Sequence, residues 1–74
     1  MYDMKYFNAN AKKLRPRCLG IFASYELDNH LIDIWDACSP YVSIRVDGVK
    51  IASRALKRNA VKIALNHLNN ERRN

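Results

Sequence analysis

The region around Asp47 and Gly48 carries the signal that most limits the possible folds. The segment Tyr41–Val46 alternates β-branched side chains with polar or aromatic ones, which is typical of a strand with one buried face. Asp-Gly follows, and a second strand-like segment, Val49–Ala52, comes next. A two-residue hairpin turn needs positive φ at both central residues, which Asp-Gly tolerates well. The sequence therefore predicts an antiparallel hairpin.

Upstream of this hairpin, the patterns predict a helix and further strands. Apolar residues at helical spacing predict a short amphipathic helix over Asp3–Leu14, which Pro16 ends. The apolar and aromatic segment Cys18–Tyr25 favours a strand. Residues 26–38 fit one face of a helix, but they also fit strands joined by a tight turn at Asp28-Asn29. The strand interpretation is slightly favoured.

The C-terminal third predicts a long helix. Ser53 is a natural N-cap, and apolar residues at helical spacing from Leu56 to Leu68 would form the buried stripe of a helix that runs to about Asn70. His67 lies on that stripe, so we expect it to be partly buried. We expect the polar segment 69–74 to fray.

These elements predict one α+β domain over residues 1–74. We expect an antiparallel sheet of three or four strands packed against a long C-terminal helix, with a short N-terminal helix, in the order α-β-β-β-α. The apolar fraction of 49% is sufficient for a packed core. No apolar run approaches the ~20 residues of a membrane span, and the first residues lack the layout of a signal peptide. We therefore expect a cytoplasmic protein that does not enter membranes.

Charge is the main indication of function. Thirteen Lys and Arg against seven Asp and Glu give a net charge of +6 and a pI near 9.7. The charges are segregated, with +4 over residues 1–24, −4 over residues 25–40 and +6 over residues 41–74. A basic surface on so small a body attracts a polyanion and releases its counterions on contact. The composition therefore favours a nucleic-acid partner.

The predicted C-terminal helix would carry the densest cations. Arg54, Arg58 and Lys62 follow one another at four-residue spacing, which would place them along one helix face, and no acidic residue lies between Asp47 and Glu71. This pattern predicts a non-enzymatic RNA-binding protein that contacts the phosphate backbone with weak sequence preference. The candidate nucleic-acid-binding residues are Arg54, Lys57, Arg58, Lys62, Lys50, Arg45, Tyr41, Lys12, Lys13, Arg15 and Arg17.

The segments Tyr41–Gly48 and 53–65 together resemble the second half of a double-stranded RNA-binding domain. In that family, an alternating strand ends near Asp-Gly, and a basic cluster then opens a helix with spaced alanines. The resemblance extends over residues 41–68. It implies that Arg54 and Lys57 would bridge phosphates across the major groove of double-stranded RNA, in a mode that reads shape more than sequence.

Aromatic residues could add stacking contacts with bases. Tyr41 shares its predicted strand face with Ser43 and Arg45, so it is the best candidate for an exposed stacking residue. Phe22 and Trp35 are expected in the core, which is the commoner place for large aromatic side chains.

Metal binding and catalysis have little support in the sequence. The potential metal ligands lack the close pairs typical of zinc sites; they are Cys18, His30, Cys38 and His67. We expect both cysteines to be reduced and buried. Neither Cys38 with a histidine nor Asp33 with Asp36 has the surroundings of a catalytic site. We therefore expect no metal, no cofactor and no enzymatic activity.

An alternative hypothesis is a small phage-type inhibitor or adaptor that docks on a host protein or a ribonucleoprotein. In that case the acidic segment 25–40 and an exposed Trp35 would form the contact surface. A homodimer is compatible with both hypotheses, because so small a core gains stability from self-association.

Overall fold

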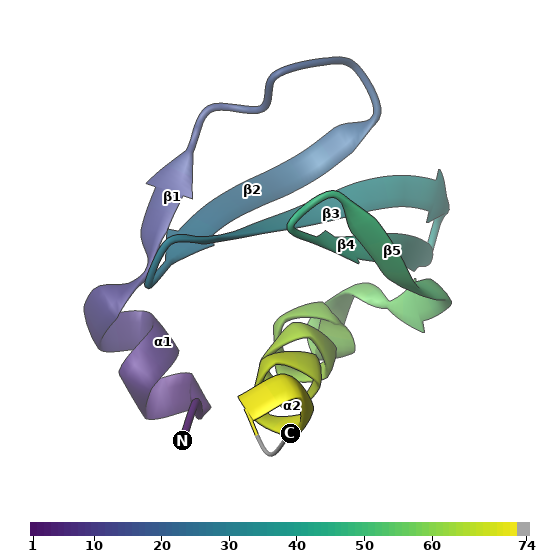
Figure 1. Ribbon diagram of the computed structural model, residues 1–74. Helices are drawn as coiled ribbons and strands as arrows, with labels where there is room; N and C mark the ends of the chain where they lie inside the picture. The colour runs from purple at the N-terminus through teal and green to yellow at the C-terminus, as the bar shows by residue number, and fades with distance from the viewer. Residues whose placement is uncertain (73–74) are drawn as a thin grey trace.

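The computed structural model describes residues 1–72 and shows an α+β domain (Figure 1). Five strands form one antiparallel sheet in the order β1-β2-β3-β4-β5, so the predicted class is confirmed, but the sheet has five strands instead of three or four. The elements along the chain are α1 (Met4–Asn10), β1 (Lys12–Leu14), β2 (Ile21–Leu27), β3 (His30–Cys38), β4 (Tyr41–Val46), β5 (Val49–Leu56), the short 3₁₀ helix η1 (Lys57–Asn59) and α2 (Ala60–Arg72).

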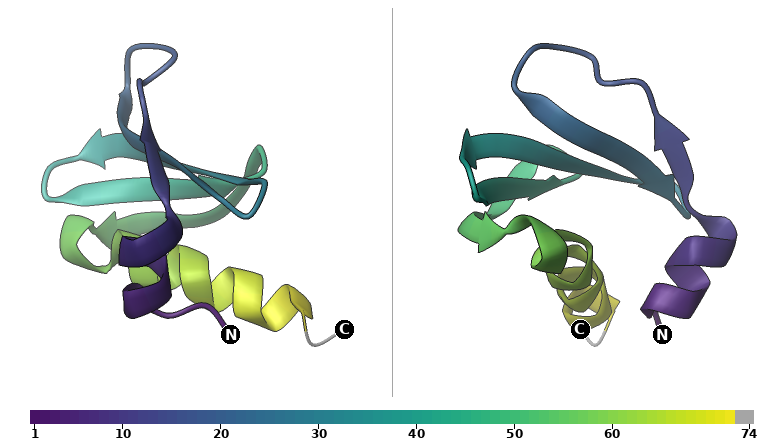
Figure 2. Two further views of the ribbon diagram at one scale, coloured as in Figure 1. Left: turned by 90° about the vertical axis from the view of Figure 1, so that its left-hand side faces the viewer. Right: turned by 180° about the vertical axis from the view of Figure 1, so that it is seen from behind.

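Both helices lie on the same side of the twisted sheet, and the loop between β1 and β2 rises on the other side (Figure 2). The sheet therefore has one face covered by helices and one face that no helix covers. We call the second one the uncovered face. No helix within residues 1–72 has the length and apolar composition needed to cross a membrane.

The core lies between the covered face and α2. The apolar positions of β4 are buried as the alternation predicted, and Ile44 is completely inaccessible to solvent. Ile44 pairs with Ile34 of β3 in the ladder, so the two side chains share the covered face. Ala64 and Leu68 of α2 belong to the same buried cluster. Each fully buried isoleucine or leucine stabilises the fold by about 1.5–3 kcal/mol.

Two tight turns of the same kind connect the central strands. Asp47 and Gly48 have φ of 52° and 85°, which confirms the predicted hairpin. Asp28 and Asn29 have φ of 50° and 68°, so the segment that fitted either helix or strand forms strands. Asp and Asn tolerate this conformation better than most residues with a side chain, and this favours the turn over a continuous helix.

The predicted N-terminal helix is shorter than expected. Asp3 caps it by accepting a hydrogen bond from the backbone N–H of Tyr6, but the helix ends at Asn10. Asparagine is a poor helix former, and the residues that follow gain backbone partners by pairing with β2 as the edge strand β1. Lys12 lies opposite Glu26 in this ladder, an arrangement of opposite charges that favours the pairing. The predicted strand Cys18–Tyr25 begins later, at Ile21.

The predicted C-terminal helix would begin at Arg54, directly after the expected cap, which is six residues before the observed start at Ala60. Ser53 is not an N-cap, because β5 continues to Leu56 and keeps its ladder bonds to β4 as far as the pair Tyr41–Leu56. Backbone groups are already satisfied in this ladder, so extending the strand avoids unpaired N–H and C=O groups. The helix α2 starts at Ala60 and reaches Arg72, beyond the predicted end. Residues 73–74 of the expected frayed segment lie outside the described residues.

Asp47 joins the two tight turns to each other. Its carboxylate accepts a hydrogen bond from the backbone N–H of Leu31 at 2.8 Å and lies 2.8 Å from Nδ1 of His30. Burial raises the pKa of Asp47, but the contacts with His30 and Leu31 outweigh this effect and hold the pKa below its ordinary value. The ionised carboxylate therefore stabilises the folded state.

We expect Asp47→Asn to lower the free energy of unfolding at pH 7 by less than about 1 kcal/mol, since the group is partly exposed. Asparagine keeps the turn conformation and an acceptor for Leu31 but loses the charge. Because the folded pKa is depressed, this contribution is fully present above the unfolded pKa of about 3.9 and disappears as the pH falls through the folded pKa. Urea unfolding of the unmodified protein and of Asp47→Asn, at pH 7 and at pH 3, measures the difference in the free energy of unfolding. An equal difference at both pH values would contradict the prediction.

Candidate nucleic-acid interface

The candidate RNA-binding cations near the end of β5 are exposed, but they do not lie along one face of a helix. Arg54 is in β5, and Lys57 and Arg58 are in η1; all three side chains are exposed. Lys62 is the only member of the predicted helical row that lies in α2. The prediction of one helical row was wrong because the helix starts at Ala60, but the three preceding cations remain close together along the chain.

Arg54 occupies a bulge with an uncommon backbone conformation. Ala52 pairs with Ile44 and Ala55 pairs with Val42, so two residues of β5 face the single residue Ser43. Arg54 has φ of 61°, a region that favours glycine and that costs a residue with a side chain about 1 kcal/mol or more. A bulge redirects side chains at a sheet edge. The chain thus presents a cation at a position where glycine would be less strained.

The end of the sheet next to η1 also gathers exposed apolar side chains. In an antiparallel sheet, the start of β2, the turn from β3 to β4 and the end of β5 lie at the same end, on the right in Figure 1. We call this region, residues 19–22, 38–41 and 54–58, the η1 end. Within residues 1–72, the exposed large apolar side chains include three from this region, namely Leu19, Phe22 and Tyr41, which are 97%, 56% and 41% exposed.

Lys57 connects the aromatic and cationic parts of the η1 end. Its Nζ lies 4.5 Å from the centre of the Phe22 ring, within the range of a cation–π interaction. Lys57 also lines a hollow of about 230 Å³ together with Pro40, Leu56 and Arg58. Leu56 is the ladder partner of Tyr41, so the hollow adjoins the start of β4.

The cations of the η1 end have no acidic partner. Among the Lys and Arg side chains of residues 1–71, only Arg17 forms an ion pair with a carboxylate. The positive charges of Arg54, Lys57 and Arg58 are therefore not neutralised within this part of the chain. Such a cluster attracts anions from solution.

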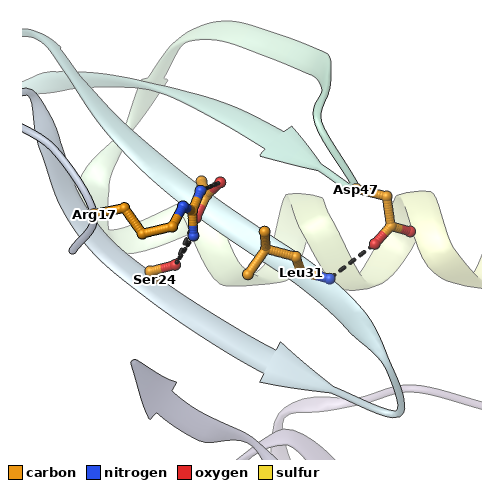
Figure 3. A network of polar contacts seen from close by, with 5 residues as sticks. Arg17, Ser24, Leu31 and Asp47 are labelled. Carbon is orange, nitrogen blue, oxygen red and sulfur yellow. Dashed lines mark hydrogen bonds and ion pairs between the residues drawn. The ribbon is translucent and has the colours of Figure 1, made fainter. Parts of the chain in front are cut away.

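Arg17 has a structural partner on the uncovered face. Its guanidinium donates to Asp33 at 2.6 Å and reaches Ser24 at 3.5 Å (Figure 3), and the Ser24 hydroxyl donates to Asp33 at 2.5 Å. Asp33 and Ser24 are buried. The hydrogen bond and the charge of Asp33 raise the pKa of Arg17 above its ordinary value. This network fixes the loop between β1 and β2 against the sheet.

Arg45 covers Trp35 on the same face. The guanidinium carbon of Arg45 lies 4.8 Å from the centre of the indole ring, and Gly20 of the loop approaches the six-membered part of the indole. Trp35 is half-buried here and lies outside the core cluster, contrary to the prediction. Within residues 1–72, Trp35 Nε1 and Arg45 Nε are buried without a hydrogen-bond partner.

Phe22 was also predicted to be in the core, and the structure contradicts this. A change of register between Ile21 and Ala23 occurs at the start of β2, and both of these residues are buried. Phe22 lies between them, and its side chain is exposed at the η1 end. The alternation of the strand was the available signal, but the bulge that decides which side faces the core cannot be read from the sequence.

The remaining candidate residues occupy separate surfaces. Lys50 is exposed and pairs with Arg45 at the β5 edge, whereas Lys12 and Lys13 are exposed on β1 at the opposite edge. Arg15 is exposed in the loop that follows β1, and Lys62 lines a groove between α2 and the N-terminal segment. The structure thus brings Arg54, Lys57, Arg58 and Tyr41 together, and it places Arg17, Arg45 and Lys50 on the uncovered face.

The cysteines are free and exposed, so the prediction that they are buried was wrong. Cys18 lies in the loop before β2, and Cys38 is the last residue of β3, next to the turn to β4, so neither belongs to the core cluster. His67 is partly buried, as predicted, and its Nε2 lies 3.1 Å from a carboxylate oxygen of Glu71. Within the described part of the chain, no cluster of three or more His, Cys, Asp or Glu side chains could hold a metal ion.

In comparisons with known proteins, no family model matches the chain, and neither a curated protein nor a solved structure matches it.

Proposed function

We propose that this protein is a non-enzymatic RNA-binding protein that uses the η1 end to contact the phosphate backbone, with weak sequence preference. The observation that carries the proposal is the group of exposed cations Arg54, Lys57 and Arg58, which no carboxylate within residues 1–71 neutralises. Each phosphate contact with such a side chain releases condensed counterions, which supplies most of the affinity of non-specific binding.

The strained backbone conformation of Arg54 also supports RNA binding at the η1 end. Positive φ at a residue other than glycine is concentrated at functional sites. A cation that is held on a bulge beside two further cations can contact a phosphate without disturbing the ladder between β4 and β5. This arrangement replaces the helical row that the sequence predicted, but the same residues would meet the RNA.

The alternative, a small inhibitor or adaptor that docks on a host protein, draws less support from the acidic segment 25–40. Asp33 is buried and paired with Arg17, and Asp28 accepts hydrogen bonds from the hydroxyl groups of Tyr2 and Tyr6. Trp35 lies under Arg45. These side chains are already engaged inside the protein, so they offer a partner fewer free groups than the η1 end does.

The dependence of RNA affinity on salt tests the proposal. Three or four phosphate contacts predict a slope of roughly −2 to −4 for the logarithm of the association constant against the logarithm of the salt concentration. Lys57→Gln should make the slope less steep by about 1, because one contact is lost. Lys5→Gln, a substitution of an exposed lysine on α1, should leave the slope unchanged. A flat dependence in the unmodified protein would contradict phosphate binding and favour the docking alternative.

A further inference from the structure

The η1 end combines two exposed aromatic rings with a hollow that is lined by both apolar and cationic side chains. Pro40 and Leu56 form the apolar part of the hollow, and Lys57 and Arg58 contribute the charges. Its volume of about 230 Å³ is below the ~300–1,000 Å³ of clefts that enclose whole small-molecule ligands. A hollow of this size suits one ring system of a longer chain better than a free ligand.

Phe22 and Tyr41 are large aromatic side chains that the fold leaves exposed to solvent. Phe22 lies at the sheet margin with Lys57 over its ring, and Tyr41 begins β4 directly beside Pro40. Exposed aromatic side chains beside cations are the usual means of holding single-stranded nucleic acid, since bases stack on the rings while the cations hold the phosphates. Lys57 makes the surface continuous, because it contacts Phe22 and also lines the hollow.

We propose that the η1 end binds single-stranded RNA in preference to double-stranded RNA, by stacking unpaired bases on Phe22 and Tyr41 and seating one base in the hollow between Pro40 and Leu56. This inference rests on the proposed RNA binding and specifies its substrate. Base faces are accessible to aromatic rings only where the bases are unstacked, whereas an A-form duplex offers mainly phosphates and 2′-hydroxyl groups. Cations alone would suit both forms, but the aromatic rings and the hollow favour the single strand.

The test compares a 12-nucleotide single strand with the duplex formed by the same strand and its complement. Affinities are measured by fluorescence anisotropy at one fixed salt concentration. We expect the single strand to bind at least fivefold more tightly. Phe22→Leu and Tyr41→Leu should each weaken single-strand binding roughly 5- to 100-fold, the range for the loss of one base stack, and should leave duplex binding unchanged.

Val49→Ala provides the matched control, because Val49 is an exposed apolar residue of β5 at the opposite end from η1. Both aromatic side chains are exposed, so all three variants should keep the melting temperature of the unmodified protein. If a variant loses stability, measuring its affinity well below its melting temperature keeps the comparison valid.

Each outcome decides between the hypotheses. Equal affinity for both forms, with no effect of the aromatic substitutions but a steep salt dependence, would overturn the stacking model and leave phosphate binding intact. Tighter binding of the duplex would also overturn it, and would agree with the resemblance to double-stranded RNA-binding domains. If neither the single strand nor the duplex binds, both the stacking model and the proposed function are overturned.

Discussion

Arg54→Glu combined with Arg58→Glu should lower the affinity for RNA well over tenfold. The double substitution changes the local charge by four units, because two attractive contacts with phosphates become repulsive ones. Both side chains are exposed and neither forms an ion pair within residues 1–71, so the fold should be retained. Fluorescence anisotropy with labelled RNA measures the affinity, and circular dichroism checks the fold.

A second charge reversal separates the site from the overall charge of the protein. Lys5→Glu combined with Lys13→Glu changes the net charge equally, but Lys5 is on α1, and Lys13 is exposed on β1, where it lies opposite Tyr25 at the other edge of the sheet from β5. This protein should lose much less affinity, through the long-range field alone. Equal losses in the two double variants would show that binding follows net charge and that the η1 end is not the site.

Arg54→Gly adds a test that separates function from stability. Glycine adopts positive φ at no steric cost, so this substitution relieves the strain at the bulge and should keep or raise the melting temperature. The same substitution removes one phosphate contact and should weaken RNA binding. A variant that is at least as stable as the original protein and that binds RNA less well would show that the arginine serves binding. Unchanged affinity would indicate that Arg54 does not contact RNA.

The sequence predicts the central sheet well because its signals are local. The alternation over Tyr41–Val46 and the two residues Asp47-Gly48 determine a hairpin without reference to the rest of the chain. The start of α2, in contrast, depends on whether residues 53–56 form a helix or pair with β4, which is a contact between separate segments of the chain. Residues 53–56 have a plausible cap and helical spacing, but pairing with β4 satisfies their backbone groups first. For the same reason, β1 was missed, since only β2 gives residues 12–14 a partner.

Only the part of the candidate site that consists of neighbours in the sequence could be predicted. Arg54, Lys57 and Arg58 are neighbours in the sequence, so they stay together in space whether the backbone is helical or extended. Phe22 joins them only because the start of β2 and the end of β5 meet at one end of the sheet. Arg17 was predicted to bind RNA from its charge alone, and its partner Asp33 lies 16 residues away. Contacts between distant segments such as these cannot be read from spacing.

Asp33→Ala should destabilise the protein by about 2–3 kcal/mol, because a buried carboxylate that accepts from two groups is removed. The Ser24 hydroxyl, fully buried, would keep no acceptor, and the loop that carries Arg17 would lose its anchor. Urea unfolding at pH 7 measures the change. Asp36→Ala is the matched control, because Asp36 is on the same strand and exposed. Its effect should remain within about 0.5 kcal/mol.

The double variant Asp33→Leu with Ser24→Ala shows why Asp33→Ala should destabilise the protein. The cause is either the buried Ser24 hydroxyl left without an acceptor or the lost ion pair between Asp33 and Arg17. Replacing both partners with apolar side chains leaves no buried polar side chain at these two paired positions of β2 and β3, so most of the stability lost in Asp33→Ala should return. Arg17 can turn to solvent, since half of its side chain is already exposed. If the double variant is as unstable as Asp33→Ala, the ion pair with Arg17 itself holds the loop. If Asp33→Ala alone changes nothing, the network does not stabilise the uncovered face.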